Sequence, residues 1–498
     1  MAADRRHLTK SGFLTGHQCR KALHLSIFER EALAPPDAEG RARMAAGQRV
    51  GNLARGLFPD GVAGWSHPFD DVEAAAAHTR ACLANRPPAV FEATFASPEG
   101  LSARVDILAR TGRGWRLIEV KSSTSVKPEH LPDVAFQLHV LRTCGIEVEA
   151  VELLQPNREY VRRGELDLPA FFTSTNLTAD AEARLPAMAL LAADLRRMLE
   201  SGERPEVPIG PQCMDPRECA ALGTCWADVP PDSVLEISYL RWEEKFALYD
   251  RGVRLIDDVP ADVRLPSRSR RHVEAHQAHR PKIEVADLRA FLDSLSYPIF
   301  LLDFETVAPA IPIWDGTRPY ERIPFQFSLH IIRVAGGDPD HTGFLAEIGP
   351  DPRPALLDAL LPATAGSGSI LAYHMPFELG VMKELAAAFP DRRTEIEARL
   401  PRMDDLIKPF RGWHYWLPAM GGSFSIKSVA PAIAPELSYD GLEVADGLAA
   451  SLAYESLLDD PAAPGVDKTR RALLDYCERD TLAMVRVLQA VERAAQGA

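Results

Sequence analysis

The stretch Leu117–Ser123, LIEVKSS, read with ARVDIL at 103–108, decides the fold expected for the first half of the chain. Apolar and polar residues alternate in both stretches, as they do in β-strands whose side chains point to opposite faces in turn. The alternation places Asp106, Glu119 and Lys121 on one face, opposite the valines and isoleucines. Two carboxylates and a lysine on neighbouring strands are suited to hold Mg²⁺ or Mn²⁺ and to activate water against a phosphodiester. A surface ion pair between Glu119 and Lys121 is the alternative explanation.

The composition limits the kind of protein. A chain of 498 residues exceeds one hydrophobic core and predicts two to four domains. A net charge of −14 argues against passive coating of nucleic acid, but not against a nuclease whose acids bind metal. We see no apolar run near the ~20 residues that span a bilayer and no apolar core of a signal peptide. We therefore expect a cytoplasmic protein without a membrane partner and with reduced thiols.

The order of helical and strand patterns predicts two α/β domains. Residues 1–228 combine the strands of Asp106 and Glu119 with a helix at His130–Thr143 and a long helix at Ala179–Ser201. Residues 284–498 begin with a helix and a strand and end with a long helical pattern. Residues 229–283 are expected to form a helical and basic connector between these two domains.

The connector carries a local excess of positive charge. Between residues 264 and 282 the only acid is Glu274, and the basic residues are Arg264, Arg268, Arg270, Arg271, Arg280 and Lys282. A solvated linker explains such a run, and so does a segment that follows nucleic-acid phosphates. The sequence leaves both explanations open.

The first domain resembles a known nuclease superfamily. RVDIL followed by LIEVKSS is similar to the PD-(D/E)xK nucleases, in the RecB-like branch that includes the CRISPR-associated exonucleases. Gln137 in AFQLHVL matches a glutamine of that branch, Glu92 matches a frequent acid, and Leu141 replaces the usual tyrosine. The resemblance implies a restriction-endonuclease-like fold. It also implies a metal at Asp106 and Glu119, with catalytic roles for these two residues, Lys121 and Gln137.

Four of the seven cysteines form a second pattern. Cys213, Cys219 and Cys225 follow one another at intervals of six, and Cys19 lies near the N-terminus. Thiolates at such spacing bind zinc or an iron–sulfur cluster, although free thiols are also possible. In the RecB-like nucleases that the chain resembles, one early and three late cysteines hold a [4Fe–4S] cluster. The three other cysteines, Cys82, Cys144 and Cys477, are expected to be small buried apolar residues.

The last third of the chain carries a second group of acids. The apolar strand Ile299–Glu305 ends with Asp303 and Glu305 on one face, and Glu378 begins a helical pattern. Tyr476 and Asp480 are four residues apart and therefore lie on one side of a helix. Four acids that bind two divalent ions, with a tyrosine to orient water, suit a two-metal exonuclease.

In this order the motifs resemble the DEDD exonucleases of the ribonuclease H-like fold, in the subclass with a Tyr-x-x-x-Asp motif. The resemblance implies metal ligands at Asp303, Glu305 and Asp480 and catalytic roles for Tyr476 and Glu378, although Glu378 stands where Asp is usual. Two further residues are supporting candidates, namely Asp405 as an acid and Lys427 as a phosphate contact.

The combination of motifs resembles a bacterial family of unknown biological role. It predicts a metal-dependent nuclease that hydrolyses phosphodiester bonds in nucleic acid, with DNA favoured over RNA, during repair or defence. The alternative is a nucleic-acid-binding iron–sulfur protein in which one or both nuclease sites are degenerate. A metal-bound scaffold for protein partners is a third possibility.

Overall fold

The computed structural model describes residues 7–65, 71–436 and 443–497. The chain is a mixed α/β protein with mixed sheets, and its contacts divide it into two compact units. Unit 1 comprises Met1–Val229 and Pro309–Tyr320, and unit 2 comprises Pro230–Ala308 and Glu321–Ala498. Within the described ranges, no helix combines the length and the apolar character needed to cross a membrane.

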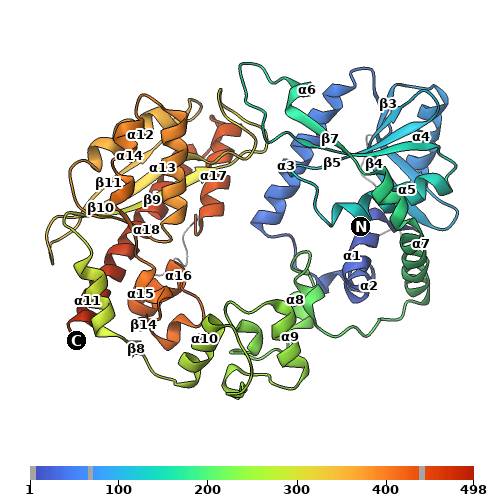
Figure 1. Ribbon diagram of the computed structural model, residues 1–498. Coiled ribbons are helices and arrows are strands. Elements are labelled where there is room, and N and C mark those ends of the chain that lie inside the picture. The colour runs from blue at the N-terminus through green and yellow to red at the C-terminus, as the bar shows by residue number, and fades with distance from the viewer. Residues whose placement is uncertain (1–6, 66–70, 437–442, 498) are drawn as a thin grey trace. The chain divides into compact units, whose positions relative to one another are not determined.

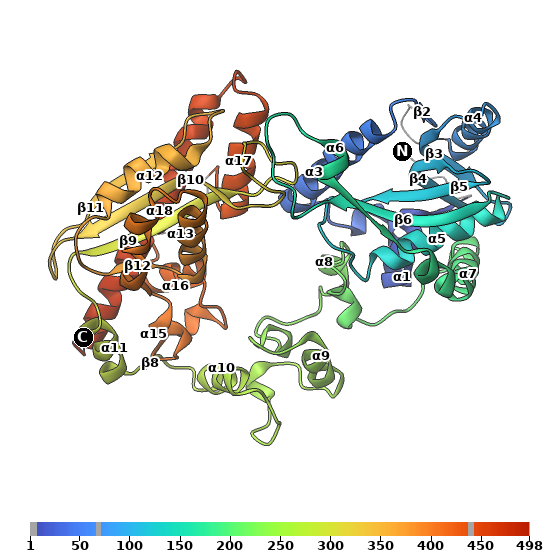
Figure 2. The same cartoon turned by 45° about the horizontal axis from the view of Figure 1, so that its top comes forward.

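Unit 1 is built on a seven-stranded mixed sheet (Figures 1 and 2). The strand order is β2-β3-β4-β5-β6-β7, and β1 pairs with the beginning of β4. The strands are β1 (Leu8–Thr9), β2 (Val62–Ala63), β3 (Ala89–Ala96), β4 (Leu101–Arg110), β5 (Trp115–Val120), β6 (Val148–Pro156) and β7 (Phe172–Asn176). The helices are α1 (Lys10–Gln18), α2 (Arg20–Phe28), α3 (Ala38–Ala54), α4 (Val72–Ala84), α5 (His130–Thr143), α6 (Leu168–Phe171), α7 (Thr178–Ser201) and α8 (Leu222–Cys225).

The sheet of unit 1 buries apolar side chains on both faces. Leu117 belongs to the cluster that α1, α5 and α7 form on one face, and Ile118 belongs to the cluster that contains α3 residues. This is the alternation predicted for the second strand. In β4 the prediction is only partly right, because Val105 packs with the first cluster and Ile107 with the second. Opposite this point β3 is irregular, since Glu92 has a φ of 54°.

Unit 2 contains a five-stranded mixed sheet in the order β11-β10-β9-β12-β13. The strands are β9 (Ile299–Val307), β10 (Ile323–Ile332), β11 (Asp340–Leu345), β12 (Ile370–Ala372) and β13 (Met403–Asp405), and a separate pair joins β8 (Lys282–Ile283) to β14 (Tyr415–Trp416). The helices are α9 (Trp242–Asp250), α10 (Ser267–Gln277), α11 (Val285–Asp293), α12 (Pro352–Ala363), α13 (Pro376–Ala388), α14 (Arg393–Glu397), α15 (Lys408–Arg411), α16 (Ile426–Ile433), α17 (Gly447–Asp459) and α18 (Val466–Ala495).

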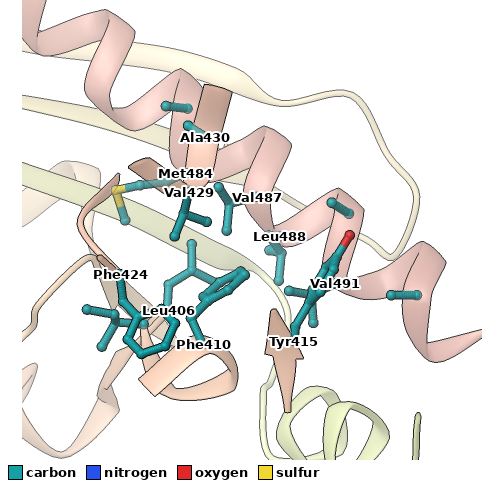
Figure 3. Close-up of a cluster of buried hydrophobic side chains, with 14 of the residues drawn as sticks. Leu406, Phe410, Tyr415, Phe424, Val429, Ala430, Met484, Val487, Leu488 and Val491 are labelled. Carbon is teal, nitrogen blue, oxygen red and sulfur yellow. The ribbon is translucent and has the colours of Figure 1, made fainter. Parts of the chain in front are cut away.

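Helix α18 supplies a large part of the unit 2 core (Figure 3). Met484, Val487, Leu488 and Val491 recur at the spacing that brings helical side chains onto one face. They pack with residues of α15, α16 and the neighbouring loops, and the same cluster includes Leu301 of β9. Side chains of β9 that alternate with Leu301 pack against α12 and α13 instead. The sheet therefore lies between two helical layers.

The predicted connector is part of unit 2 from residue 230 onward. Its helices α9 and α10 share a small hydrophobic cluster, to which α10 contributes Val273. The buried His272 ring lies 6.1 Å from the Trp413 ring, and its Nδ1 accepts a hydrogen bond from the Ser238 N–H. Three residues of the basic run, Arg268, Arg270 and Arg271, thus lie on a packed helix.

The packing of α18 predicts a stability difference within one helix. Leu488 is fully buried, whereas Leu474 on the same helix is 43% exposed. Leu488→Ala should lower the free energy of unfolding of unit 2 by about 2–4 kcal/mol, because it removes buried methyl groups and leaves a cavity. Leu474→Ala should change it by less than about 0.5 kcal/mol. Urea unfolding of both variants measures this, and equal midpoints would contradict the packing.

Candidate functional site

The structure brings the predicted residues of the first site together in unit 1. Asp106 lies on β4, Glu119 on β5 and Gln137 on α5, and Lys121 directly follows β5. Glu119 is 2% exposed and Gln137 is fully buried. Glu119 and Lys121 do form an ion pair at 2.7 Å, but its carboxylate is buried and not at the surface.

Hydrogen bonds connect these residues to a further acid, Asp133 of α5. The Lys121 ammonium donates to Glu119 Oε1 and to Asp133 Oδ2, both at 2.7 Å. The Gln137 amide donates to Glu119 Oε2 and to Asp133 Oδ1, both at 2.8 Å. Asp106 Oδ2 accepts a hydrogen bond from the Val120 N–H at 2.8 Å. Each of the three acids is therefore fixed in orientation.

Lys10 of α1 also enters this network. Its ammonium donates to Glu119 Oε1 at 2.8 Å and lies 3.4 Å from Asp133 Oδ1. Neither Lys10 nor Asp133 belongs to the sequence motifs described above. Asp133 precedes Gln137 by four residues, so helical spacing alone places the two on one face. No local pattern marks Lys10, which reaches the site through the packing of α1.

Charge and burial shift the pKa values in this site. Burial and the negative charge of Glu119 raise the pKa of Asp106 to about 7. Burial also acts to raise the pKa of Glu119, but the ammonium groups of Lys10 and Lys121 outweigh it and hold that pKa well below its usual range. Asp106 is thus the carboxyl that carries a proton near neutral pH until a cation compensates its charge.

Two residues that the resemblance singled out lie outside the network. The Glu92 carboxylate forms ion pairs with Arg55 at 2.7 Å and with Arg104 at 3.0 Å. Leu141 is fully buried in the core between the sheet and its helices. Glu92 is therefore paired with two arginines, and Leu141 contributes to the hydrophobic core.

The four cysteines of the second pattern line one cavity of unit 1. Cys19, Cys213, Cys219 and Cys225 line this cavity together with Lys21 and apolar residues. Burial, followed by the neighbouring cysteines, raises the pKa of the Cys219 thiol. A shared cavity lined by four thiols and apolar side chains has the donor set of a thiolate metal centre.

The second predicted site forms in unit 2. Asp303, Glu305, Tyr476 and Asp480 line an open pocket with parts of β9, α13, α17 and α18. The Tyr476 hydroxyl donates a hydrogen bond to the Asp480 carboxylate. Glu378 of α13 is 3% exposed, and its Oε2 has no hydrogen-bond partner among the residues that the structure describes.

Burial and mutual repulsion both raise the pKa values of the acids in this pocket. Burial and then the neighbouring carboxylates raise the pKa values of Asp303 and Glu305 well above their usual range. Burial and Asp405 raise the pKa of Glu378 to about 8. Acids arranged in this way remain ionised together only when a cation compensates them.

Cys477 is fully buried, as expected, but its surroundings are not wholly apolar. Its thiol donates to Asp303 Oδ2 at 3.7 Å. One ligand atom from each of Asp303, Glu305 and Cys477 lies within 4.8 Å of the other two. Cys82 and Cys144 are half-buried and are not fully apolar in their contacts, since each thiol donates to a backbone carbonyl.

The two supporting candidates are held by backbone groups. Asp405 Oδ1 accepts hydrogen bonds from the His374 N–H at 2.9 Å and the Ile407 N–H at 3.1 Å. The Lys427 ammonium donates to the Ala445 carbonyl and lies 5.8 Å from the centre of the Tyr476 ring. Asp405 has a structural role at the end of β13, whereas Lys427 brings a positive charge close to the pocket.

The basic run of unit 2 lines a separate pocket. Arg271, Arg280 and Lys282 surround it together with Trp413 and Glu274. Lys282 also pairs with Glu284 at 3.1 Å. Positive side chains therefore gather at this surface of α10 and the residues that follow it.

Comparison with known proteins finds one matching family model, and that model assigns no activity. A family model described as a domain of unknown function, DUF2779, matches residues 300–425. This range includes Asp303, Glu305 and Glu378 but ends before α18, which carries Tyr476 and Asp480. No curated protein matches the chain.

The raised pKa of Glu378 predicts a pH-dependent loss of stability in metal-free protein. A carboxyl with a raised folded-state pKa keeps its proton in the folded state, so the unfolding free energy falls as the pH rises from about 4.5 to about 8. Glu378→Gln should remove on the order of 2 kcal/mol of this loss. Urea unfolding in EDTA at both ends of the interval measures it. Glu397→Gln, on the exposed side of α14, is the control, and parallel profiles for wild type and Glu378→Gln would contradict the shift.

Proposed function

We propose that the chain is a metal-dependent nuclease with two hydrolytic centres, one in each unit. The observation that carries the proposal is that each unit buries a group of carboxylates whose charges are not balanced without a cation. The substrate is nucleic acid, with DNA favoured over RNA by the resemblance of both motif sets. We infer a role in repair or defence from the same resemblance.

The first site fits a divalent cation of the Mg²⁺ or Mn²⁺ kind. Asp106 and Glu119 would hold it through oxygen atoms. The buried Gln137 Oε1, which no described residue hydrogen-bonds, would be a further acceptor beside it. When bound, such an ion lowers the pKa of water and stabilises negative charge on a phosphate. Lys121 orients Glu119 and Asp133 and places a positive charge beside the reacting phosphate. This arrangement supports a PD-(D/E)xK nuclease fold for unit 1.

The second site also fits divalent cations. Asp303, Glu305 and Asp480 would hold them, and Glu378 Oε2, which has no hydrogen-bond partner among the described residues, would supply a further oxygen. The Tyr476 hydroxyl, which donates to Asp480, would orient a water molecule. A mixed sheet between two helical layers, with two of the acids on its central strand, supports a ribonuclease H-like exonuclease fold for unit 2.

The cysteine cavity fits a thiolate-bound cofactor. Four thiolates can bind either a tetrahedral zinc ion or an iron–sulfur cluster. The resemblance to the RecB-like nucleases favours a [4Fe–4S] cluster held by Cys19, Cys213, Cys219 and Cys225, which line one cavity. Such a group would link the N-terminal helices to the loop before Val229.

Single substitutions separate the two hydrolytic centres. Asp106→Asn and Asp303→Asn each retain the shape of the side chain but remove a metal-binding charge. Each should lower cleavage by its own centre at least about a hundredfold, and the double variant should lose both activities. Labelled single- and double-stranded DNA and RNA with Mg²⁺ or Mn²⁺ provide the assay, and Asp338→Asn in an exposed loop is the control. Undiminished cleavage by the double variant would refute the proposal, while tight binding without turnover in the wild type would favour a degenerate nuclease.

The cysteine assignment is tested by composition and not by activity. Protein purified without oxygen should contain iron and sulfide, and Cys219→Ser should lose both because one ligand is missing. Cys82→Ser, outside the cavity, should retain them. If Cys219→Ser retained iron and sulfide, the ligand set would be refuted. Zinc in the wild-type protein would show that the cysteines bind a metal ion and not a cluster.

A further inference from the structure

Helix α1 lies between the first hydrolytic site and the cysteine cavity. Lys10 begins the helix and contacts Glu119, whereas Cys19 directly follows its last residue and lines the cavity. Nine helical residues span about 13 Å. One short and regular element therefore touches both groups.

The first end of α1 is fixed by the sheet. Leu8 and Thr9 pair with the beginning of β4, at Leu101 and Ser102. The Thr9 hydroxyl caps the helix by accepting a hydrogen bond from the Gly12 N–H at 3.1 Å. The backbone at the start of α1 is consequently attached to the strand that carries Asp106. The Lys10 ammonium group therefore reaches Glu119 from a fixed backbone position.

The middle of α1 is locked between two helices of unit 1. Phe13 is fully buried and stacks on Phe136 of α5, with ring centres 4.3 Å apart. At Gly16 an added Cβ would lie 2.6 Å from Leu195 of α7. The helix therefore has little room to shift without moving α5, which carries Asp133 and Gln137.

The second end of α1 is tied to the cysteine loop. The Gln18 amide donates to the Gln212 carbonyl at 2.9 Å and to the Arg217 carbonyl at 2.7 Å. These acceptors flank Cys213, and Cys19 follows Gln18 directly. A group that draws the four sulfur atoms together would thus set the position of this end of the helix.

We propose that Lys10 is a positioning residue of the first site and that α1 makes its position depend on the group bound by the four cysteines. Lys10 holds Glu119 Oε1 and lies beside Asp133, so it orients a carboxylate that the metal also needs. Because the ammonium group and the metal compete for the Glu119 carboxylate, Lys10 lowers metal affinity. The same hydrogen bond keeps Glu119 in place. The effect on cleavage rests on the proposed nuclease function, whereas the effect on metal binding does not.

The first test measures Mn²⁺ affinity by electron paramagnetic resonance in an Asp303→Asn/Asp480→Asn background, which removes the second site. Lys10→Met should bind Mn²⁺ about fivefold more tightly, because a competing positive charge is lost, and should cleave more slowly. A variant that is merely unfolded would bind more weakly. Lys10→Arg should restore wild-type affinity, and Ser11→Ala, at an exposed neighbouring position, should change neither quantity.

The second test measures the coupling to the cysteines. Protein reconstituted with iron and sulfide is compared with the same protein after both are removed. Removal should change Mn²⁺ affinity in the wild type at least about threefold, and much less in Lys10→Met, since coupled residues are not additive. Gln18→Ala, which cuts the link at the other end of α1, should weaken the coupling without touching Glu119.

The outcomes separate this proposal from the nuclease proposal. Unchanged Mn²⁺ affinity in Lys10→Met, or equal effects of iron removal in Lys10→Met and wild type, would overturn the role of Lys10 or of α1. Absence of cleavage by every variant, with the Mn²⁺ changes still present, would refute the nuclease function and leave the Lys10 coupling standing.

Discussion

Burial of negative charge without equal compensation is the constraint on which both sites depend. In unit 1 two lysines partly neutralise three acids, so Glu119 remains ionised while the pKa of Asp106 rises to about 7. In unit 2 less positive charge compensates the neighbouring acids, and the pKa values of Asp303, Glu305 and Glu378 are all raised. A carboxyl that must lose a proton to bind a cation couples metal affinity to pH. The two units therefore present the same chemistry with different amounts of built-in countercharge.

Local sequence was sufficient for most of the elements. The helix expected at His130–Thr143 is α5 with the same bounds, and the alternation around Leu117 and Ile118 places them on opposite faces of the sheet. Such patterns depend on neighbouring residues and on one buried face. Mixed α/β architecture follows from their order. The finer assignment of each unit to a nuclease fold remains a proposal that the motifs support.

The local sequence did not predict the contacts between segments that are far apart in the chain. Lys10 and Glu119 are 109 positions apart, and no periodicity connects them. Cys477 was expected to be apolar because cysteine usually packs as a small hydrophobe, yet it lies against Asp303. Within the predicted connector, Val273 and His272 pack against other residues of unit 2, which the charge pattern of the segment does not specify. These contacts depend on how elements dock, which a pattern along one segment does not specify.

The segment Pro309–Tyr320 lies between β9 and β10 in sequence but belongs to unit 1. Its Tyr320 hydroxyl donates to the Ser122 carbonyl at 2.6 Å, directly after Lys121, and the Arg162 N–H donates to the Thr317 carbonyl. During synthesis on the ribosome, unit 1 therefore lacks one of its own parts until the first strand of the next sheet has been made. Its final assembly is a late event, and a protease cut within this segment would affect the completeness of unit 1 although it falls far from Glu119 in the chain.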